Sequence, residues 1–197
     1  LGSELMPESL VRASPGAAIH DFFRENGNHF EALEHAAEAL SAEEPHDPYT
    51  VQQILQTRLL AHHGYRVVTS PSDSLPDTLR VWDESERTIY LSEALDHQNR
   101  TFQLAHALCF IEFSDVLATI TDSTSFASDS HATRCHVELA NYFAAAFLMP
   151  YDAFLDKAEE TRYDLDRLAA AFAVSIEQAA QRLTTLQRDG RRGVPFF

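Results

Sequence analysis

Residues 102–113 read FQLAHALCFIEF, and this stretch decides the fold more than any other. Its apolar residues recur at helical spacing on two sides, one marked by Phe102 and Phe113 and the other by Leu104 and Leu108. A helix that is apolar on most sides is buried at the centre of a domain. We therefore expect a central helix over 96–113, with the rest of the chain packed around it.

Helical patterns precede and follow this segment. Phe30, Leu33, Ala37 and Leu40 recur at helical spacing, and glycine and proline mark where such patterns end. A Ser/Thr/Asp-rich loop is expected over 121–131. The further predicted helices are 15–42, which starts at Ser14-Pro15, is kinked or divided at Gly27 and ends at Pro45 and Pro48; 50–63, ended by Gly64; 133–149, ended by Pro150; and pieces of 151–188.

Three short segments have the composition of strands. Tyr65–Thr69, Thr78–Trp82 and Thr88–Leu91 are rich in β-branched and aromatic residues, with turn residues between them. They predict a small antiparallel sheet, with Asp83–Glu86 as a hairpin turn. The expected fold class is therefore α+β and mostly helical.

Composition restricts the function classes. The 197 residues suit one domain with a small appendage, and the net charge of −15 argues against non-specific nucleic-acid binding. Residues 181–197 carry four arginines against one aspartate, a local charge of +3, so the other 180 residues carry −18. There is no apolar run of the roughly 20 residues that a membrane helix needs, and no signal-peptide pattern. Two cysteines make no disulfide framework, which indicates a reducing compartment. We expect 1–14 to be a tag or linker and the chain to stop before a further domain.

Arg58 stands out because it occupies the core-facing stripe of the predicted helix 50–63, beside Leu55 and Leu59. A guanidinium facing a core is costly unless it is paired. Three interpretations stay open: an internal salt bridge, an arginine whose charged end reaches out to solvent, or an anchor for an anionic ligand that arginine binds bidentately.

His106 lies where a zinc-protease helix would carry its first histidine. Such a helix needs a second histidine at i+4 and a glutamate beside the first as general base. Ala107 stands at the glutamate position and Phe110 at the second histidine position. One histidine does not hold zinc and alanine takes no proton, so we expect no enzyme, no catalytic residue and no metal ligand here.

A different metal site would use His106, Cys109, Cys135 and His136. Cys135 and His136 are helical neighbours that point about 100° apart and rarely converge on one ion. Buried cysteines that merely pack are commoner. A metallohydrolase with an unusual site is the weaker alternative.

Residues 164–186 resemble a helix-turn-helix with a turn at Ala173-Val174-Ser175. The second helix offers Glu177 and Gln181 where a DNA reader needs positive charge. A structural helix pair is therefore favoured over DNA contact, although Arg188, Arg191 and Arg192 keep a DNA- or protein-binding role for 164–192 open.

Three stretches together resemble the ImmA/IrrE-type domain, a small zincin-like α+β unit: Thr88–Leu91, Phe102–His106 and Leu139–Pro150. The segments Arg162–Leu168 and Gln181–Phe196, with the entry helix from Asp21 to Glu38, resemble the bacterial short-chain fatty-acyl regulators of the PrpR/RamB type. The resemblance covers nearly all of the chain from residue 15 onward.

This resemblance implies a cytoplasmic transcription factor of propionate and acetate metabolism, with 15–150 as its ligand-sensing domain and 151–197 as a helical extension. It implies DNA binding through an N-terminal helix-turn-helix outside this chain, a homodimer, and no contact with membranes. An iron–sulfur cluster or other metal would belong only to a further C-terminal domain. Catalytic relatives carry a glutamate where Val137 stands, and Glu138 is one position off.

The resemblance also implies an acyl-coenzyme A (acyl-CoA) or CoA ligand, which needs cations for its phosphates and an apolar channel for its pantetheine and acyl groups. For each aromatic residue, an ordinary core role is the alternative. The ligand-binding candidates are Arg58, Phe102, His106, Phe110, Phe113, Tyr142, Arg182 and Arg192.

Overall fold

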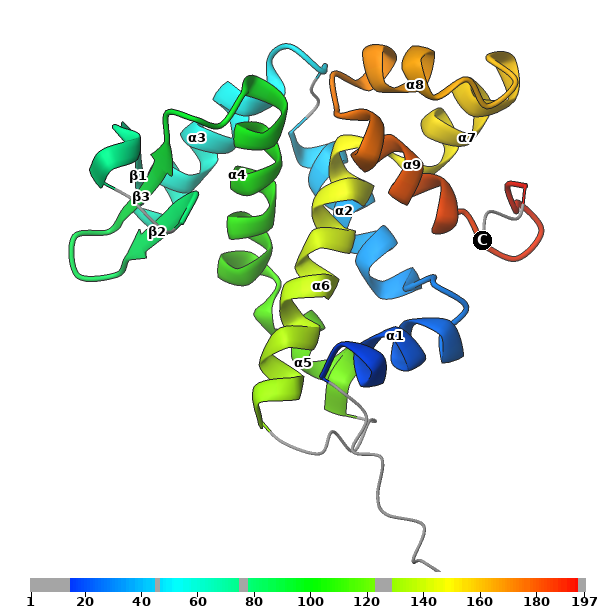
Figure 1. Ribbon diagram of the computed structural model, residues 1–197, viewed down its shortest axis with the longest axis horizontal. Helices are drawn as coiled ribbons and strands as arrows, with labels where there is room; N and C mark the ends of the chain where they lie inside the picture. The colour runs from blue at the N-terminus through cyan, green and yellow to red at the C-terminus, as the bar shows by residue number, and fades with distance from the viewer. Residues whose placement is uncertain (1–14, 45–46, 75–77, 123–128, 195–197) are drawn as a thin grey trace, which may run out of the picture.

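The computed structural model describes residues 15–44, 47–74, 78–122 and 129–194 (Figure 1). The expectations for 1–14, for Ser14 and Pro45, for the end of the chain after 194 and for most of the 121–131 loop fall outside these residues. The mostly helical α+β class is confirmed. The elements are α1 (Pro15–Glu25), α2 (Glu31–Glu43), α3 (Val51–His63), β1 (Arg66–Ser70), η1 (Ser72–Ser74), β2 (Arg80–Asp83), β3 (Thr88–Ser92), α4 (His97–Glu112), α5 (Ser114–Asp122), α6 (Asp129–Leu148), α7 (Tyr151–Glu160), α8 (Leu165–Phe172) and α9 (Ile176–Thr184).

Helices α4 and α6 lie side by side at the centre of the molecule (Figure 1). Residues 104–109 of α4 are all buried, as are residues 142–148 of α6. Helix α2 packs on α6, and α3 packs on α4. The prediction of a central helix is therefore confirmed, and α6 is its partner in the core.

Two turns form where the sequence places glycine. Helices α1 and α2 are separated at Gly27 and Asn28, whose φ values of 63° and 54° lie in the left-handed region. Gly64 ends α3 with φ 70° and donates its N–H to the Leu60 carbonyl. Both predicted breaks are confirmed.

The sheet is mixed, which corrects the predicted antiparallel arrangement. β2 and β3 form the expected antiparallel hairpin, but β1 pairs with β3 in parallel, in the order β1-β3-β2. The hairpin turn is local and can be seen in the sequence, whereas the direction of β1 depends on the crossover from β1 to β2.

The C-terminal helices form the compact pair that the sequence predicts. Ala173 ends α8 in the left-handed conformation, and Ser175 and Gln178 form a capping box at the start of α9. Within the described part of the chain, no single helix is long and apolar enough to cross a membrane; only α4 and α5 together reach that length and apolarity, as a pair bent by 74°.

Candidate functional site

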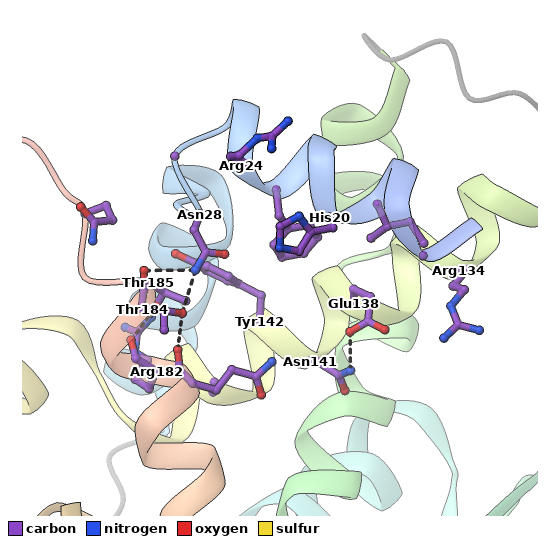
Figure 2. Close-up of a pocket in the computed structure, with 17 residues that line it drawn as sticks. His20, Arg24, Asn28, Arg134, Glu138, Asn141, Tyr142, Arg182, Thr184 and Thr185 are labelled. Atoms are coloured by element: carbon purple, nitrogen blue, oxygen red, sulfur yellow. Dashed lines mark hydrogen bonds between the residues drawn. The ribbon is translucent and has the colours of Figure 1, made fainter. Parts of the chain in front are cut away.

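A pocket of about 720 Å³ lies between α1, α6 and α9 (Figure 2). One wall comes from α1, with Ile19 and Phe23, and another from the end of α9 and the residues after it, with Thr184. The volume lies within the range of small-molecule sites in proteins. This pocket is the candidate ligand site.

Helix α6 contributes one continuous stripe to the pocket. Arg134, Glu138, Asn141, Tyr142 and Ala145 are spaced at i, i+4, i+7, i+8 and i+11, so they share one face of the helix. The opposite face of α6 packs in the core. The same helix thus supports both the fold and the site.

A buried ion pair lies beneath the pocket. Arg182 of α9 is fully buried and donates from Nη1 to Glu34 Oε1 (2.6 Å) and from Nη2 to Glu34 Oε2 (2.9 Å). Its Nε donates to the Met149 carbonyl at 3.0 Å. Burial raises the pKa of Glu34, but the hydrogen bonds and positive charge of Arg182 outweigh it, so this pKa lies below its usual value. Both groups are therefore charged and paired at neutral pH.

Tyr142 joins this ion pair to the pocket. Its hydroxyl donates to Glu34 Oε1 at 2.6 Å and accepts from the Phe30 N–H at 3.3 Å. Burial, together with the charge of Glu34, raises the pKa of Tyr142, which keeps the phenol neutral. We call Glu34, Arg182 and Tyr142 the floor cluster.

The turn between α1 and α2 is tied to α9 across the pocket. The Asn28 side chain donates to both the carbonyl (3.1 Å) and the hydroxyl (2.7 Å) oxygen of Thr184 (Figure 2). Because Asn28 follows the left-handed Gly27, this link determines where α1 leaves the body of the domain. The position of α1 over the pocket depends on it.

The basic side chains that line the pocket differ in their pairing. Arg182 is paired in the floor cluster, and Arg24 pairs with Asp21 at 2.8 Å. Neither His20 nor Arg134 makes a hydrogen bond or an ion pair with any residue that the structure describes. The pocket therefore presents one guanidinium, that of Arg134, which forms no ion pair with the described residues, together with the carboxylate of Glu138 one helical turn away.

Two of the eight predicted ligand-binding residues, Tyr142 and Arg182, line this pocket. Arg58 instead forms the internal salt bridge that the sequence allowed, with bidentate hydrogen bonds to Glu112 at 2.8 and 2.9 Å. Glu43 and Glu44 also contact its guanidinium, at 3.1 and 3.5 Å. Arg192 is exposed and pairs with Asp189 at 2.5 Å.

The other four predicted residues lie around α4, away from the pocket. The His106 ring stacks at a tilt on Phe110, with the centroids 5.2 Å apart, and Phe113 contacts Phe143. Phe102 is partly buried against the core. The structure thus separates the α4 residues from the pocket residues, whereas the sequence analysis assigned both groups to one site.

His106 has an unusual partner in Arg80 of β2. Arg80 donates from Nη1 to His106 Nδ1 at 2.9 Å and to the Gln103 carbonyl at 3.1 Å. His106 Nε2 lies beside the Val137 backbone without a hydrogen bond of normal geometry. Burial, followed by the charge of Arg80, lowers the pKa of His106 to about 4. We call Arg80 and His106 the α4 cluster.

The cysteines and His136 do not gather at this cluster. Cys109 and Cys135 are free and buried, and burial raises the pKa of Cys135 to about 11. His136 instead shares a hydrogen bond of 2.8 Å with the Thr121 hydroxyl. Among the described residues, no group of three or more His, Cys, Asp or Glu side chains is placed to hold a metal ion.

The C-terminal arginines are engaged within the domain. Arg188 pairs with Glu38 at 2.7 Å and with Glu31 at 3.3 Å. Arg191 pairs with Asp152 at 3.1 Å and with Asp156. These pairs stabilise the contacts of 182–192 with α2 and α7, and no observation on these residues favours DNA.

The sequence analysis missed several pocket residues, among them His20, Phe23, Asn28 and Thr184. One signal was available: α6 is apolar over most of its surface, yet Arg134, Glu138 and Asn141 form a polar row at helical spacing. A polar row on an otherwise apolar helix marks the face that borders a cavity or solvent.

The profile of the IrrE N-terminal-like domain (Peptidase_M78) matches residues 60–184. The regulator RamB of Mycobacterium tuberculosis (strain ATCC 25618 / H37Rv), described as HTH-type, is 38% identical over 196 residues, 99% of this chain and 39% of that protein. The HTH-type regulator PrpR of the same organism is 34% identical over 99% of this chain and 39% of its own length. The propionyl-CoA carboxylase regulator of Cereibacter sphaeroides is 34% identical over 96% of this chain and 40% of that protein.

A solved structure, described as a Mycobacterium tuberculosis transcriptional regulator, superposes with a TM-score of 0.86 at 32% identity, covering 91% of this chain and 54% of the other. The chain spans about two fifths of the length of the curated relatives it matches. RamB and PrpR are described as HTH-type transcriptional regulators, and the resemblance found in the sequence is confirmed. This chain therefore belongs to the IrrE N-terminal-like domain family, and its homologues include the RamB and PrpR regulators.

Proposed function

We propose that this chain is the ligand-sensing domain of a transcriptional regulator of short-chain fatty-acid metabolism, and that it binds CoA or a short acyl-CoA in the pocket between α1, α6 and α9. The observation that carries the proposal is the pocket itself, which has a paired, hydrogen-bonded floor and an arginine, Arg134, that forms no ion pair with the described residues. The names of the relatives, which include a propionyl-CoA carboxylase regulator, supply the metabolic context.

The chemistry of the pocket suits this ligand. An acyl-CoA carries anionic phosphates at one end and a neutral pantetheine and acyl chain at the other, so it needs cations and an apolar channel in one site. Arg134 provides positive charge, His20 offers a hydrogen-bonding imidazole, and Ile19, Phe23 and Ala145 provide apolar walls. The amides of Asn141 and Gln181 offer hydrogen bonds for pantetheine.

The regulator's output would arise outside this chain. We propose that DNA is bound by a helix-turn-helix elsewhere in the full-length protein, and that a homodimer reads paired half-sites. Ligand binding would shift the equilibrium between two conformations of the domain that have different affinities for the ligand. In this proposal the domain senses the ligand and performs no catalysis.

Thermal unfolding of the 197-residue chain with free CoA, acetyl-CoA and propionyl-CoA tests the proposal, with ATP as the control for a nonspecific nucleotide. A ligand that binds only the folded state adds about 2.7 kcal/mol at 100 times its Kd, which raises Tm by several degrees. We expect CoA or its esters to raise Tm and ATP to leave it unchanged. Equal shifts for ATP and the CoA compounds, or no shift with any of them, would contradict the proposal.

A variant that fills the pocket locates the binding. Ala145→Phe places a phenyl ring into the cavity from α6, whereas Ala170→Phe makes the same change at an exposed site on α8. We expect the first variant to lose the ligand-induced shift and the second to keep it. If Ala145→Phe keeps the full shift, the ligand binds elsewhere.

A further inference from the structure

The pocket is elongated along α6. Arg134 and Ala145 are eleven residues apart in one helix, which separates them by about 16 Å along its axis. Figure 2 shows Arg134 at one end of the pocket and Arg182, Thr184 and Thr185 at the other. A ligand that fills the pocket must therefore extend along α6, with one end near Arg134.

The two ends differ in available positive charge. We call the end at Arg134 the near end and the end at Arg182 the far end. At the far end Arg182 is neutralised by Glu34, and both carboxylate oxygens accept hydrogen bonds from it. At the near end Arg134 is exposed and makes no hydrogen bond or ion pair with any residue the structure describes. An arginine without a carboxylate partner is free to bind a phosphate, and its planar fork suits phosphate oxygens.

The far end is suited to a neutral group. Ala145, eleven residues along α6 from Arg134, presents apolar surface there, and the Tyr142 hydroxyl is already bonded to Glu34. The Asn28 amide is likewise engaged by Thr184. A charged group at this end would meet no free cation, and its desolvation would go uncompensated.

Glu138 separates the two ends. Its carboxylate lies between Arg134 and Tyr142 on the α6 stripe and accepts a hydrogen bond from the Asn141 amide at 3.2 Å (Figure 2). A negative charge in the middle of the pocket repels a phosphate placed there. The phosphates are thereby restricted to the Arg134 end, and the middle accepts N–H donors.

We infer that the ligand binds along α6 in a single orientation, with its phosphates at Arg134 and its acyl group at Ala145. Ala145 then determines the length of the acyl chain that the domain accepts. This inference rests on the proposed function and adds the orientation of the ligand and the residue that sets specificity. Ala145 is suited to that role because its side chain is small and borders the cavity. A larger residue there would shorten the channel.

Calorimetric titration of free CoA, acetyl-CoA, propionyl-CoA and butyryl-CoA into the unaltered chain, Arg134→Gln and Ala145→Leu tests the orientation. Arg134→Gln should weaken all four ligands by a similar factor, about tenfold for one lost charge-assisted contact, with a smaller salt dependence. Arg66→Gln removes one charge from an exposed site on β1 and is the matched control, with affinities expected within twofold.

Ala145→Leu should leave free CoA within twofold and weaken the esters progressively, butyryl-CoA most. If Ala145→Leu weakens the binding of free CoA as strongly as that of the esters, the assigned orientation is wrong. The orientation is also wrong if the loss of affinity in Arg134→Gln grows with the length of the acyl chain. Binding by the unaltered chain that neither variant changes would overturn this inference and leave the proposed function standing. A failure of the unaltered chain to bind any CoA compound would overturn both.

Discussion

The floor cluster and the α4 cluster each place an arginine beside a second ionisable group, but Arg182 is fully buried and Arg80 only partly buried, and the two arginines have different partners. In the floor cluster Arg182 meets the carboxylate of Glu34, and both guanidinium branches are engaged. In the α4 cluster Arg80 meets a neutral imidazole and a backbone carbonyl. In the floor cluster charge pairing outweighs burial and keeps both groups ionised, whereas in the α4 cluster burial and the charge of Arg80 keep the histidine neutral.

The difference also separates two places that the sequence analysis treated as one. His106, which the sequence analysis compared with the first histidine of a zinc-protease helix, accepts a hydrogen bond from Arg80 in the structure. The pocket with polar and charged walls instead lies beside α6, next to the floor cluster.

The largest expected effect is on the floor cluster. Arg182→Met leaves the buried Glu34 carboxylate without its cation, and we expect the free energy of unfolding to fall by about 3–5 kcal/mol. Chemical denaturation measures it. Arg192→Met removes an arginine that is 62% exposed, and that variant should stay within about 0.5 kcal/mol of the unaltered chain. Equal losses in the two variants would show that the buried pair contributes no more than a surface pair.

A pH series separates the two clusters. His106 has a folded-state pKa of about 4, below the ordinary 6.5, so the unfolded chain binds more protons between these values and stability falls as pH drops through this window. The full effect is on the order of 3 kcal/mol. His106→Gln keeps an acceptor for Arg80 and should flatten the dependence of unfolding free energy on pH between about 6.5 and 4.

His97→Gln, at an exposed position of α4, is the control and should leave that slope unchanged. Glu34 has a lowered pKa, so its contribution is present above the unfolded value near 4.5 and is lost only as pH falls further. An unaltered slope in His106→Gln would mean that His106 is not neutral in the folded chain.

The smallest effect is expected at Arg80. Arg80→Met gives up hydrogen bonds to His106 and Gln103 but also removes a partly buried charge that no carboxylate of the described residues pairs with, so we expect a loss below about 1.5 kcal/mol. The same variant should raise the pKa of His106, because the second cause of its depression is gone; NMR titration of the imidazole measures this. A loss as large as that of Arg182→Met would remove the contrast between the clusters.

Much of the local structure was accessible from the sequence. The break at Gly27, the end of α3 at Gly64 and the hairpin turn over 83–86 each depend on residues close together in the chain, and all three are confirmed. The α8–α9 pair follows for the same reason. α5 has no counterpart among the predicted helices.

The site was accessible only in part. Tyr142 and Arg182 were predicted and do line the pocket, but the predicted site combined them with α4 residues that lie elsewhere. The wall from α1 and the link from Asn28 to Thr184 join residues 156 positions apart. No spacing rule within one helix indicates such a neighbour.

By itself, the sequence determined the helical periodicity, the turns that need a left-handed backbone, and the family, because each of these depends on patterns among residues a few positions apart. Only the tertiary structure decided which charges are paired. The sequence left open whether Arg58 binds a ligand or a carboxylate, and in the structure it binds Glu112, which is 54 residues away. Arg182 binds Glu34, which is 148 residues away. A charge near the core must find a partner, but which partner it finds depends on how the helices pack.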